Sequence, residues 1–181
     1  MVWEGLYALP FVLEPKMLLL EHELPDVRER ALALFAGKAQ RAVGLRGDVV
    51  IFVTANEEMQ KLNREYRRKN EPTDVLTFPS QSPKLLGDIA ISVEIAAANA
   101  AELGHSTETE VKILILHGLL HLAGYDHESD NGNMQARETE LRQQLKLPTG
   151  LIERAHASAP RSPERRTSQR PVPRKPQGSG K

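Results

Sequence analysis

The chain contains no cysteine, only 4% aromatic residues and no excess of charge of either sign. Without cysteine there is neither a disulfide nor a thiolate ligand, so a zinc ion would have to be bound by histidine or carboxylate. The lack of cysteine also fits a reducing cytoplasm. So few aromatic rings exclude an extensive surface on which nucleotide bases could stack.

Signals for export or membrane insertion are lacking as well. The first fifteen residues carry Glu4 and Glu14 but no lysine or arginine, so they lack the basic start of a secretory signal. The apolar run Met17–Leu20 is far shorter than the roughly 20 residues that span a bilayer. We therefore expect a soluble cytoplasmic protein that has no membrane partner.

The zero net charge conceals an uneven distribution along the 181 residues. Eight of the 24 basic residues and one of the 24 acidic residues fall from Arg154 onward, which leaves 16 basic and 23 acidic residues in 1–153. This C-terminal segment is rich in Pro, Ser, Arg and Gly. We expect one folded domain over 1–153 and a disordered basic tail over 154–181. The tail either raises affinity for RNA phosphates or is a solvated extension without a role.

Hydrophobic periodicity and turn residues predict an α+β (mixed α/β) fold, in which helices pack on a small mixed sheet of about four strands. Strands are expected at 17–23, 48–54, 75–78 and 89–92. Helices are expected at 25–43, 57–67, 92–103, 111–122 and 130–147. Pro25 should begin the first helix, and Asn56 and Ser106 should be helix caps. The residues expected to be buried along the first two helices are Val27, Ala31, Leu32, Leu34, Phe35, Met59, Leu62 and Tyr66.

Three of the six histidines lie within eleven residues, at His117, His121 and His127. Residues four apart share one face of a helix and are about 6 Å apart along its axis. His117 and His121 would therefore face one ion, Gly124 would end the helix as a C′ glycine, and the returning chain would deliver His127. Three imidazole ligands with the fourth position open are typical of catalytic zinc. We predict one zinc ion per chain, although nickel or cobalt would suit the same ligands.

The residue after the first histidine is Gly118. In zinc proteases of this spacing that position holds a glutamate, which is the general base. Glycine cannot accept a proton, so the sequence counts against a peptidase and favours another hydrolysis. The remaining histidines, His22, His105 and His156, fit no metal-binding pattern and are expected to be ordinary surface or partly buried residues.

Four sequence blocks follow one another along 48–145. They are LNREYR at Leu62–Arg67, TDVLTFP at Thr73–Pro79, LGDI at Leu86–Ile89, and the histidine block His117–His127 with Glu128 after it. In this order and combination they resemble the bacterial YbeY family. The combination is far more specific than the histidine spacing alone.

This resemblance implies a function. The family consists of metal-dependent endoribonucleases that are specific for single strands and act in 16S rRNA 3′-end maturation and ribosome quality control. The implied substrate is single-stranded RNA, with the ribosome or small-subunit proteins as further partners and no DNA. The family's zinc ligands fall on His117, His121 and His127, and its functionally important arginine falls on Arg67. Arg67 and His117 are thus the expected catalytic residues; without the resemblance, Arg67 would be interpreted as a solvated helix-end cation.

Several other polar residues lie near these blocks. Asp74 is expected to shape a turn, and Asp88 to be a strand-edge residue, although either could orient a histidine from behind. Asp126 and Glu128 flank the third histidine, and each is either the missing base or a solvated loop carboxylate. Met134 is expected to be an ordinary core residue.

The expected mechanism has zinc polarise a phosphodiester oxygen or lower the pKa of a bound water, while Arg67 holds the phosphate. The nucleophile is either that water or the RNA 2′-OH. Because the body is acidic, the basic strip at 64–69 or the tail must supply the attractive field. Two alternatives stay open: a peptidase-like zinc hydrolase with a glutamate from elsewhere beside the metal, and an RNA-binding assembly factor whose structural zinc is closed by Asp126.

Overall fold

A mixed sheet forms the centre of the fold in the computed structural model, which describes residues 18–21, 27–81, 84–127 and 129–148. Its four strands are β1 (Leu18–Leu20), β2 (Asp48–Thr54), β3 (Val75–Pro79) and β4 (Leu85–Ser92), in the spatial order β1-β2-β4-β3. β1, β2 and β4 are parallel, and β3 pairs antiparallel to β4 at the edge. The predicted α+β class with a small mixed sheet is confirmed.

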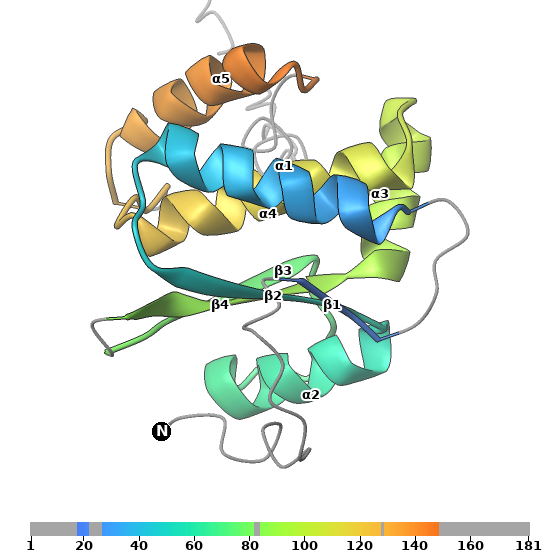
Figure 1. The fold of residues 1–181 in the computed structure, drawn as a ribbon. Helices are drawn as coiled ribbons and strands as arrows, with labels where there is room; N and C mark the ends of the chain where they lie inside the picture. Colours follow the sequence, from blue (N-terminus) through green and yellow to red (C-terminus); the bar gives the residue numbers. More distant parts are fainter. Residues whose placement is uncertain (1–17, 22–26, 82–83, 128, 149–181) are drawn as a thin grey trace, which may run out of the picture.

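The helices cover the sheet unequally (Figure 1). They are α1 (Glu29–Val43), α2 (Asn56–Arg67), α3 (Val93–Leu103), α4 (Thr107–Leu122) and α5 (Asn133–Leu145). α2 lies alone against one face, while α4 lies on the other face beneath α1 and α5 (Figure 1). α4 contacts β3, β4, α1, α3 and α5, so it is enclosed on all sides.

The sequence of α4 explains this central position. Its buried residues run almost without interruption from Val111 to Leu120, and a helix that is apolar all round belongs inside a core. Gly118 lets α4 approach the sheet, because a Cβ atom there would lie 2.8 and 2.9 Å from the side chain of Ile89 on β4. Among the described residues, no helix has both the length and the apolar character needed to span a bilayer.

Two predictions about α1 are wrong. The helix begins at Glu29, after the extended Arg28, and Pro25 lies outside the described residues. Leu34 is 61% exposed. The buried stripe has helical spacing at Leu32, Phe35, Ala36 and Ala39, and a residue two positions from Leu32 points about 200° away from it.

α2 ends at Arg67 as predicted, but its N-cap and the burial of Tyr66 differ from expectation. Ala55 is the N-cap, and Asn56 is the first helical residue, with its side-chain oxygen accepting a hydrogen bond from the Ser92 hydroxyl at 2.6 Å. Tyr66 is 44% exposed and contacts Phe78 edge-on, with ring centroids 4.9 Å apart. The buried residues of α2 are Met59, Leu62 and Asn63.

The remaining predicted boundaries are correct to within a few residues. Ser106 accepts a hydrogen bond from the Thr109 N–H at 3.2 Å and is the predicted cap of α4, while Ser92 caps α3 in the same way. β4 begins four residues before the predicted strand at 89–92, and α5 is shorter at both ends than 130–147. The predicted tail at 154–181 lies outside the described residues.

Gly118→Ala should destabilise the protein. Overpacking against Ile89 costs about 1–3 kcal/mol, and the better helix propensity of alanine returns at most about 1 kcal/mol. We expect a melting temperature several degrees lower in thermal unfolding followed by circular dichroism.

Ile89→Ala and the double variant Gly118→Ala/Ile89→Ala are the controls. The double variant should lose clearly less stability than the two single changes added together, since the clash is gone. Additive losses would show that α4 and β4 do not meet at this point.

Candidate metal centre

The end of α4 is shaped so that the chain turns back at once. The Tyr125 N–H donates to the Leu120 carbonyl at 3.1 Å, and the Gly124 N–H donates to the His121 carbonyl at 3.0 Å. Gly124 has φ +89°, the left-handed conformation that such a C-terminal turn requires. The predicted role of Gly124 is confirmed, and the turn brings His127 back toward the helix end.

The three predicted ligands come together. One nitrogen or another from each of His117, His121 and His127 lies within 4.8 Å of the others. His117 is buried, His121 is half-buried and His127 is exposed. The site therefore lies at the surface. His117 and His121 are on α4, and the exposed His127 is on the turn that follows it.

The partners of the two helical histidines fix which nitrogen faces the centre. His117 Nδ1 is 3.0 Å from the Glu138 carboxylate, and His121 Nδ1 is 3.0 Å from the main-chain carbonyl of Tyr125. These oxygens only accept, so in the neutral rings each Nδ1 carries the proton. Each Nε2 then presents a bare lone pair.

These two Nε2 atoms are 3.1 Å apart. Two neutral acceptors at that separation repel each other unless a proton or a metal ion lies between them. Tetrahedral zinc with Zn–N bonds of about 2.0–2.1 Å places neighbouring nitrogens about 3.3 Å apart. The donor set and spacing at His117 and His121 thus fit a metal ion.

The electrostatics of the site favour an unprotonated imidazole at His121. Burial, together with the neighbouring charges of His117 and His127, lowers the pKa of His121 to about 4. Burial alone would raise the pKa of Glu138, but the hydrogen bond from His117 and the charge of Arg142 outweigh it and leave that pKa below its usual value. Near neutral pH, His121 is therefore ready to bind a metal and Glu138 is ionised.

Sequence reasoning missed Glu138 and Arg142. They are 2% and 1% exposed, and Arg142 Nε donates to Glu138 at 2.8 Å. A signal was available: Glu138 lies on the buried stripe of α5 between Met134 and Leu141, where an apolar residue is expected. Met134 is a core residue, as predicted.

Arg67 is not among the residues that the structure brings together with the histidines. It is exposed in the last turn of α2, on the opposite face of the sheet from α4 (Figure 1). Both helix ends nevertheless lie near the start of β4. For α4, a Cβ on Gly87 of β4 would lie 2.7 Å from Leu122. For α2, Tyr66 contacts Phe78 of β3, and Phe78 pairs with Asp88 of β4.

Asp74, Asp88 and Asp126 are not grouped with the three candidate ligands, although the charge of Asp126 acts on His121. Asp74 accepts a hydrogen bond from the Val75 N–H at 2.9 Å, as expected of a turn residue. Asp88 alternates with Ile89, which faces α4, so Asp88 points toward α2. Burial raises the pKa of Asp88, and its Oδ1 has no hydrogen-bond partner among the described residues. Asp126 accepts from Ser129 at 2.8 Å and does not join the histidine group.

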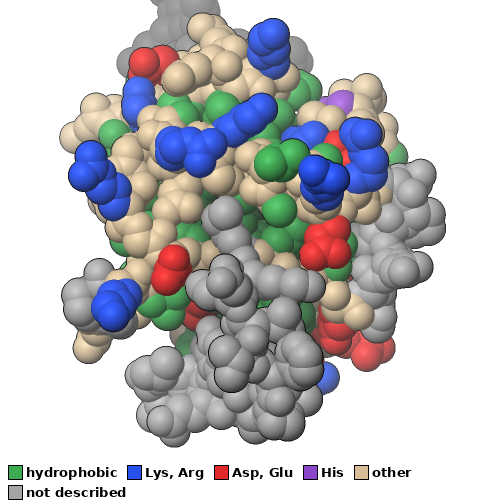
Figure 2. All heavy atoms as spheres, in the orientation of Figure 1, with side chains coloured by type: hydrophobic (Ala, Val, Ile, Leu, Met, Phe, Trp, Pro, Cys, Tyr) green, Lys and Arg blue, Asp and Glu red, His purple; other side chains and the backbone are tan. Residues whose placement is uncertain are grey.

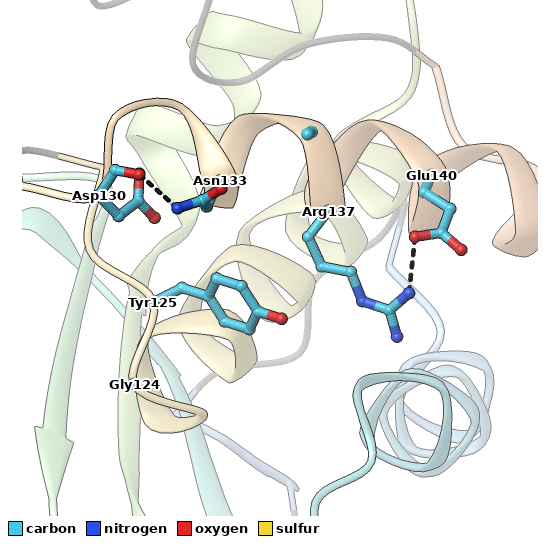
Figure 3. A pocket seen from close by; sticks show the side chains of 7 residues that line it. Gly124, Tyr125, Asp130, Asn133, Arg137 and Glu140 are labelled. Carbon is cyan, nitrogen blue, oxygen red and sulfur yellow. Dashed lines mark hydrogen bonds and ion pairs between the residues drawn. The ribbon is translucent and has the colours of Figure 1, made fainter.

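A separate open pocket of about 550 Å³ lies beside the same turn (Figure 3). Arg137 faces Tyr125 across it and pairs with Glu140 at 2.7 Å. The residues that line it are Gly124, Tyr125, Asp130, Asn133, Ala136, Arg137 and Glu140. None is a histidine, so this pocket is distinct from the candidate metal centre.

A mixed sheet packed with helices, and three histidines that converge at the end of α4, define the class of protein: an α+β protein with a candidate mononuclear metal site. Comparison with known proteins then identifies the family. The family model for Endoribonuclease YbeY matches residues 16–146. The chain belongs to the YbeY endoribonuclease family, whose members are RNA-cleaving hydrolases.

Individual relatives agree with this assignment. The Endoribonuclease YbeY of Koribacter versatilis is 51% identical over 150 residues, which cover 83% of this chain and 99% of the relative. That of Solibacter usitatus is 47% identical over 131 residues, covering 72% and 88%. The solution structure of TM1509 from Thermotoga maritima is similar with a TM-score of 0.51 and 28% identity, and the match covers 71% of this chain and 89% of that one.

Metal-free protein should bind one equivalent of zinc in a calorimetric titration. His117→Ala and His121→Ala should each abolish this binding, because either change removes one of the two converging Nε2 atoms. Zinc at 100 times its dissociation constant should also stabilise the folded protein by about 2.7 kcal/mol.

His156→Ala, which lies outside the histidine motif, is the control and should bind like the wild type. Zinc binding that survives the loss of His117 and of His121 would contradict the assignment of the site.

Proposed function

We propose that this protein is a single-strand-specific, zinc-dependent endoribonuclease that acts in 16S rRNA 3′-end maturation and ribosome quality control. His117, His121 and His127 would bind one zinc ion, and His117 and Arg67 would take part in catalysis. The substrate would be single-stranded ribosomal RNA rather than DNA, met in the cytoplasm with the ribosome or small-subunit proteins as partners. Residues 1–153 would form the catalytic domain, and 154–181 the basic tail.

The approach of the Nε2 atoms of His117 and His121 to 3.1 Å carries the metal-binding part of this proposal, and membership of the YbeY family supports RNA as the substrate. Within the described residues, which leave out Glu128, no carboxylate joins the three histidines. Three protein ligands are typical of a catalytic zinc, whereas structural zinc has four. This supports an enzyme over an assembly factor whose zinc is closed by Asp126.

Gly118 supports nuclease over peptidase chemistry. In this fold a Cβ at this position is directed at the side chain of Ile89 on β4, so a glutamate there would have to displace that side chain. The general base of the zinc proteases therefore has no room at its usual place.

Different residues of the chain would hold the metal ligands and bind the RNA. The chemistry that bound zinc supplies is Lewis-acid polarisation of the scissile phosphodiester. Glu138 and the Tyr125 carbonyl hold the rings of His117 and His121 in place. Arg67 would donate to a phosphate of the same strand and neutralise its charge. Since the ends of α2 and α4 both lie near the start of β4, a single strand that curves round this end of the sheet would contact both.

Cleavage of a labelled single-stranded RNA and its matched duplex by metal-loaded protein tests the proposal. Wild type should cut only the single strand. Arg67→Ala should slow cleavage at sub-saturating RNA by about 10-fold, the usual effect of losing one charge-assisted hydrogen bond to a phosphate. Arg68→Asn is the matched control, because it removes the neighbouring charge and suits the left-handed backbone at φ 59°; its rate should change little.

The product ends distinguish the two nucleophiles. A 2′,3′-cyclic phosphate opposite a 5′-OH indicates attack by the 2′-OH with loss of the 5′-oxygen, and a 3′-OH opposite a 5′-phosphate indicates attack by water with loss of the 3′-oxygen. Equal cleavage by wild type, His117→Ala and Arg67→Ala would overturn the ribonuclease proposal and favour an RNA-binding assembly factor.

The basic tail should contribute to RNA affinity through phosphate neutralisation. Replacing its eight basic residues by glutamine should weaken binding and flatten the salt dependence, since each lost phosphate contact reduces the slope by about 0.7 on single strands. Filter binding over a series of salt concentrations measures both quantities. An unchanged slope would show that the tail makes no phosphate contact.

A further inference from the structure

Two of the three candidate ligands are held by hydrogen-bond partners of different kinds. The His117 ring is fixed by the Glu138 carboxylate and the His121 ring by the Tyr125 carbonyl, each at 3.0 Å. Among the described residues, none forms a hydrogen bond with the exposed His127 ring. His117 is thus the ligand with the charged partner, and it is also the most buried of the three.

The Glu138 carboxylate is itself fixed from its other side. Arg142, one turn further along α5, donates from two of its nitrogens to Oε1 of Glu138, with Nε at 2.8 Å. The second oxygen, Oε2, is the one that faces His117. Arg142 also donates to the Pro148 carbonyl at 2.9 Å, which anchors it just beyond the helix end. The guanidinium and the imidazole therefore divide the two carboxylate oxygens between them.

Stability does not account for this arrangement. A buried ion pair commonly costs about as much in desolvation as it gains, and apolar residues of similar size are often equally or more stabilising at such a position. Glu138 also interrupts the apolar stripe by which α5 packs on the core. An apolar side chain at this position could not accept the hydrogen bond from the Nδ1–H of His117.

We propose that Glu138, held in place by Arg142, is the positioning residue that keeps the His117 proton on Nδ1 and directs its Nε2 lone pair at the metal. A charged hydrogen-bond acceptor raises the basicity of the ring. His117 should therefore bind the metal more strongly than His121, whose acceptor is a neutral carbonyl. This inference rests on the metal-binding part of the proposed function and is independent of RNA cleavage.

The ring nitrogens of metal-free wild-type protein give the first test. In ¹⁵N spectra of histidine-labelled protein at neutral pH, His117 should carry its proton on Nδ1. A proton on Nε2 of His117 would overturn the proposal, and this measurement requires no variant.

The double variant Glu138→Gln/Arg142→Met gives the second test. It removes both buried charges together, so neither is left uncompensated. His117 should then show a mixture of the two tautomers, while His121, held by the main chain, keeps its proton on Nδ1 and is the internal control. Zinc affinity, measured by competition with a chelator, should fall by about 10–100-fold, as is usual for loss of such a partner.

The double variant Arg137→Met/Glu140→Gln is the matched control. It removes an ion pair of the same kind from the same helix, but at the surface, where Arg137 and Glu140 side chains are 29% and 66% exposed. Its zinc affinity should equal that of the wild type. A folded Glu138→Gln/Arg142→Met protein with wild-type zinc affinity would show a purely structural role. A protein that binds zinc as predicted but does not cut RNA would refute the ribonuclease proposal alone.

Discussion

The close approach of His117 Nε2 and His121 Nε2 is the interaction on which the site depends. Because the Nδ1–H groups donate hydrogen bonds to Glu138 and to the Tyr125 carbonyl, the two Nε2 atoms face each other at 3.1 Å. Such a pair is unfavourable in the neutral protein, and a bound cation converts its repulsion into two ligand bonds. Because the pKa of His121 is low, about 4, protons compete poorly with a metal ion for its Nε2 atom near neutral pH. In the proposed site, metal affinity would therefore depend on how the rings are held, and His127 would complete a pair that α4 has already arranged.

The surrounding fold keeps that pair rigid. α4 is buried almost along its whole length, with Gly118 against Ile89 and Leu122 against Gly87, so its C-terminal end cannot shift relative to the sheet. α5 then supplies Glu138 across the helix interface. Basic side chains, not an acidic surface, predominate on the face of the molecule formed by α1 and α5, despite the acidic composition of residues 1–153 (Figure 2). Charge is thus unevenly distributed over the folded domain, as it is along the chain. An RNA strand could therefore contact a basic part of the surface although residues 1–153 are acidic overall.

The sequence predicted the features that short-range geometry determines. The i, i+4 spacing of His117 and His121 and the helix-ending glycine were sufficient to predict that the three histidines lie together. The β-branched run Asp48–Thr54 was sufficient to foresee β2. Predictions failed where tertiary packing decides. Tyr66 has the spacing of a buried residue but lies at the exposed end of α2, and Glu138 looks like a surface charge until Arg142 and His117 surround it. The position of Arg67 across the sheet from the histidines depends on strand order, which periodicity along the chain does not encode.

A crystal structure of the zinc-loaded protein, with anomalous differences recorded at the zinc edge, tests the central claim most directly. The account predicts one zinc ion per chain, bound by the Nε2 atoms of His117 and His121 and by a ring nitrogen of His127, with no fourth protein ligand. It also predicts that Glu138 still accepts a hydrogen bond from the Nδ1–H of His117. Zinc closed by Asp126 as a fourth ligand, or bound through Nδ1 of His117, would contradict it.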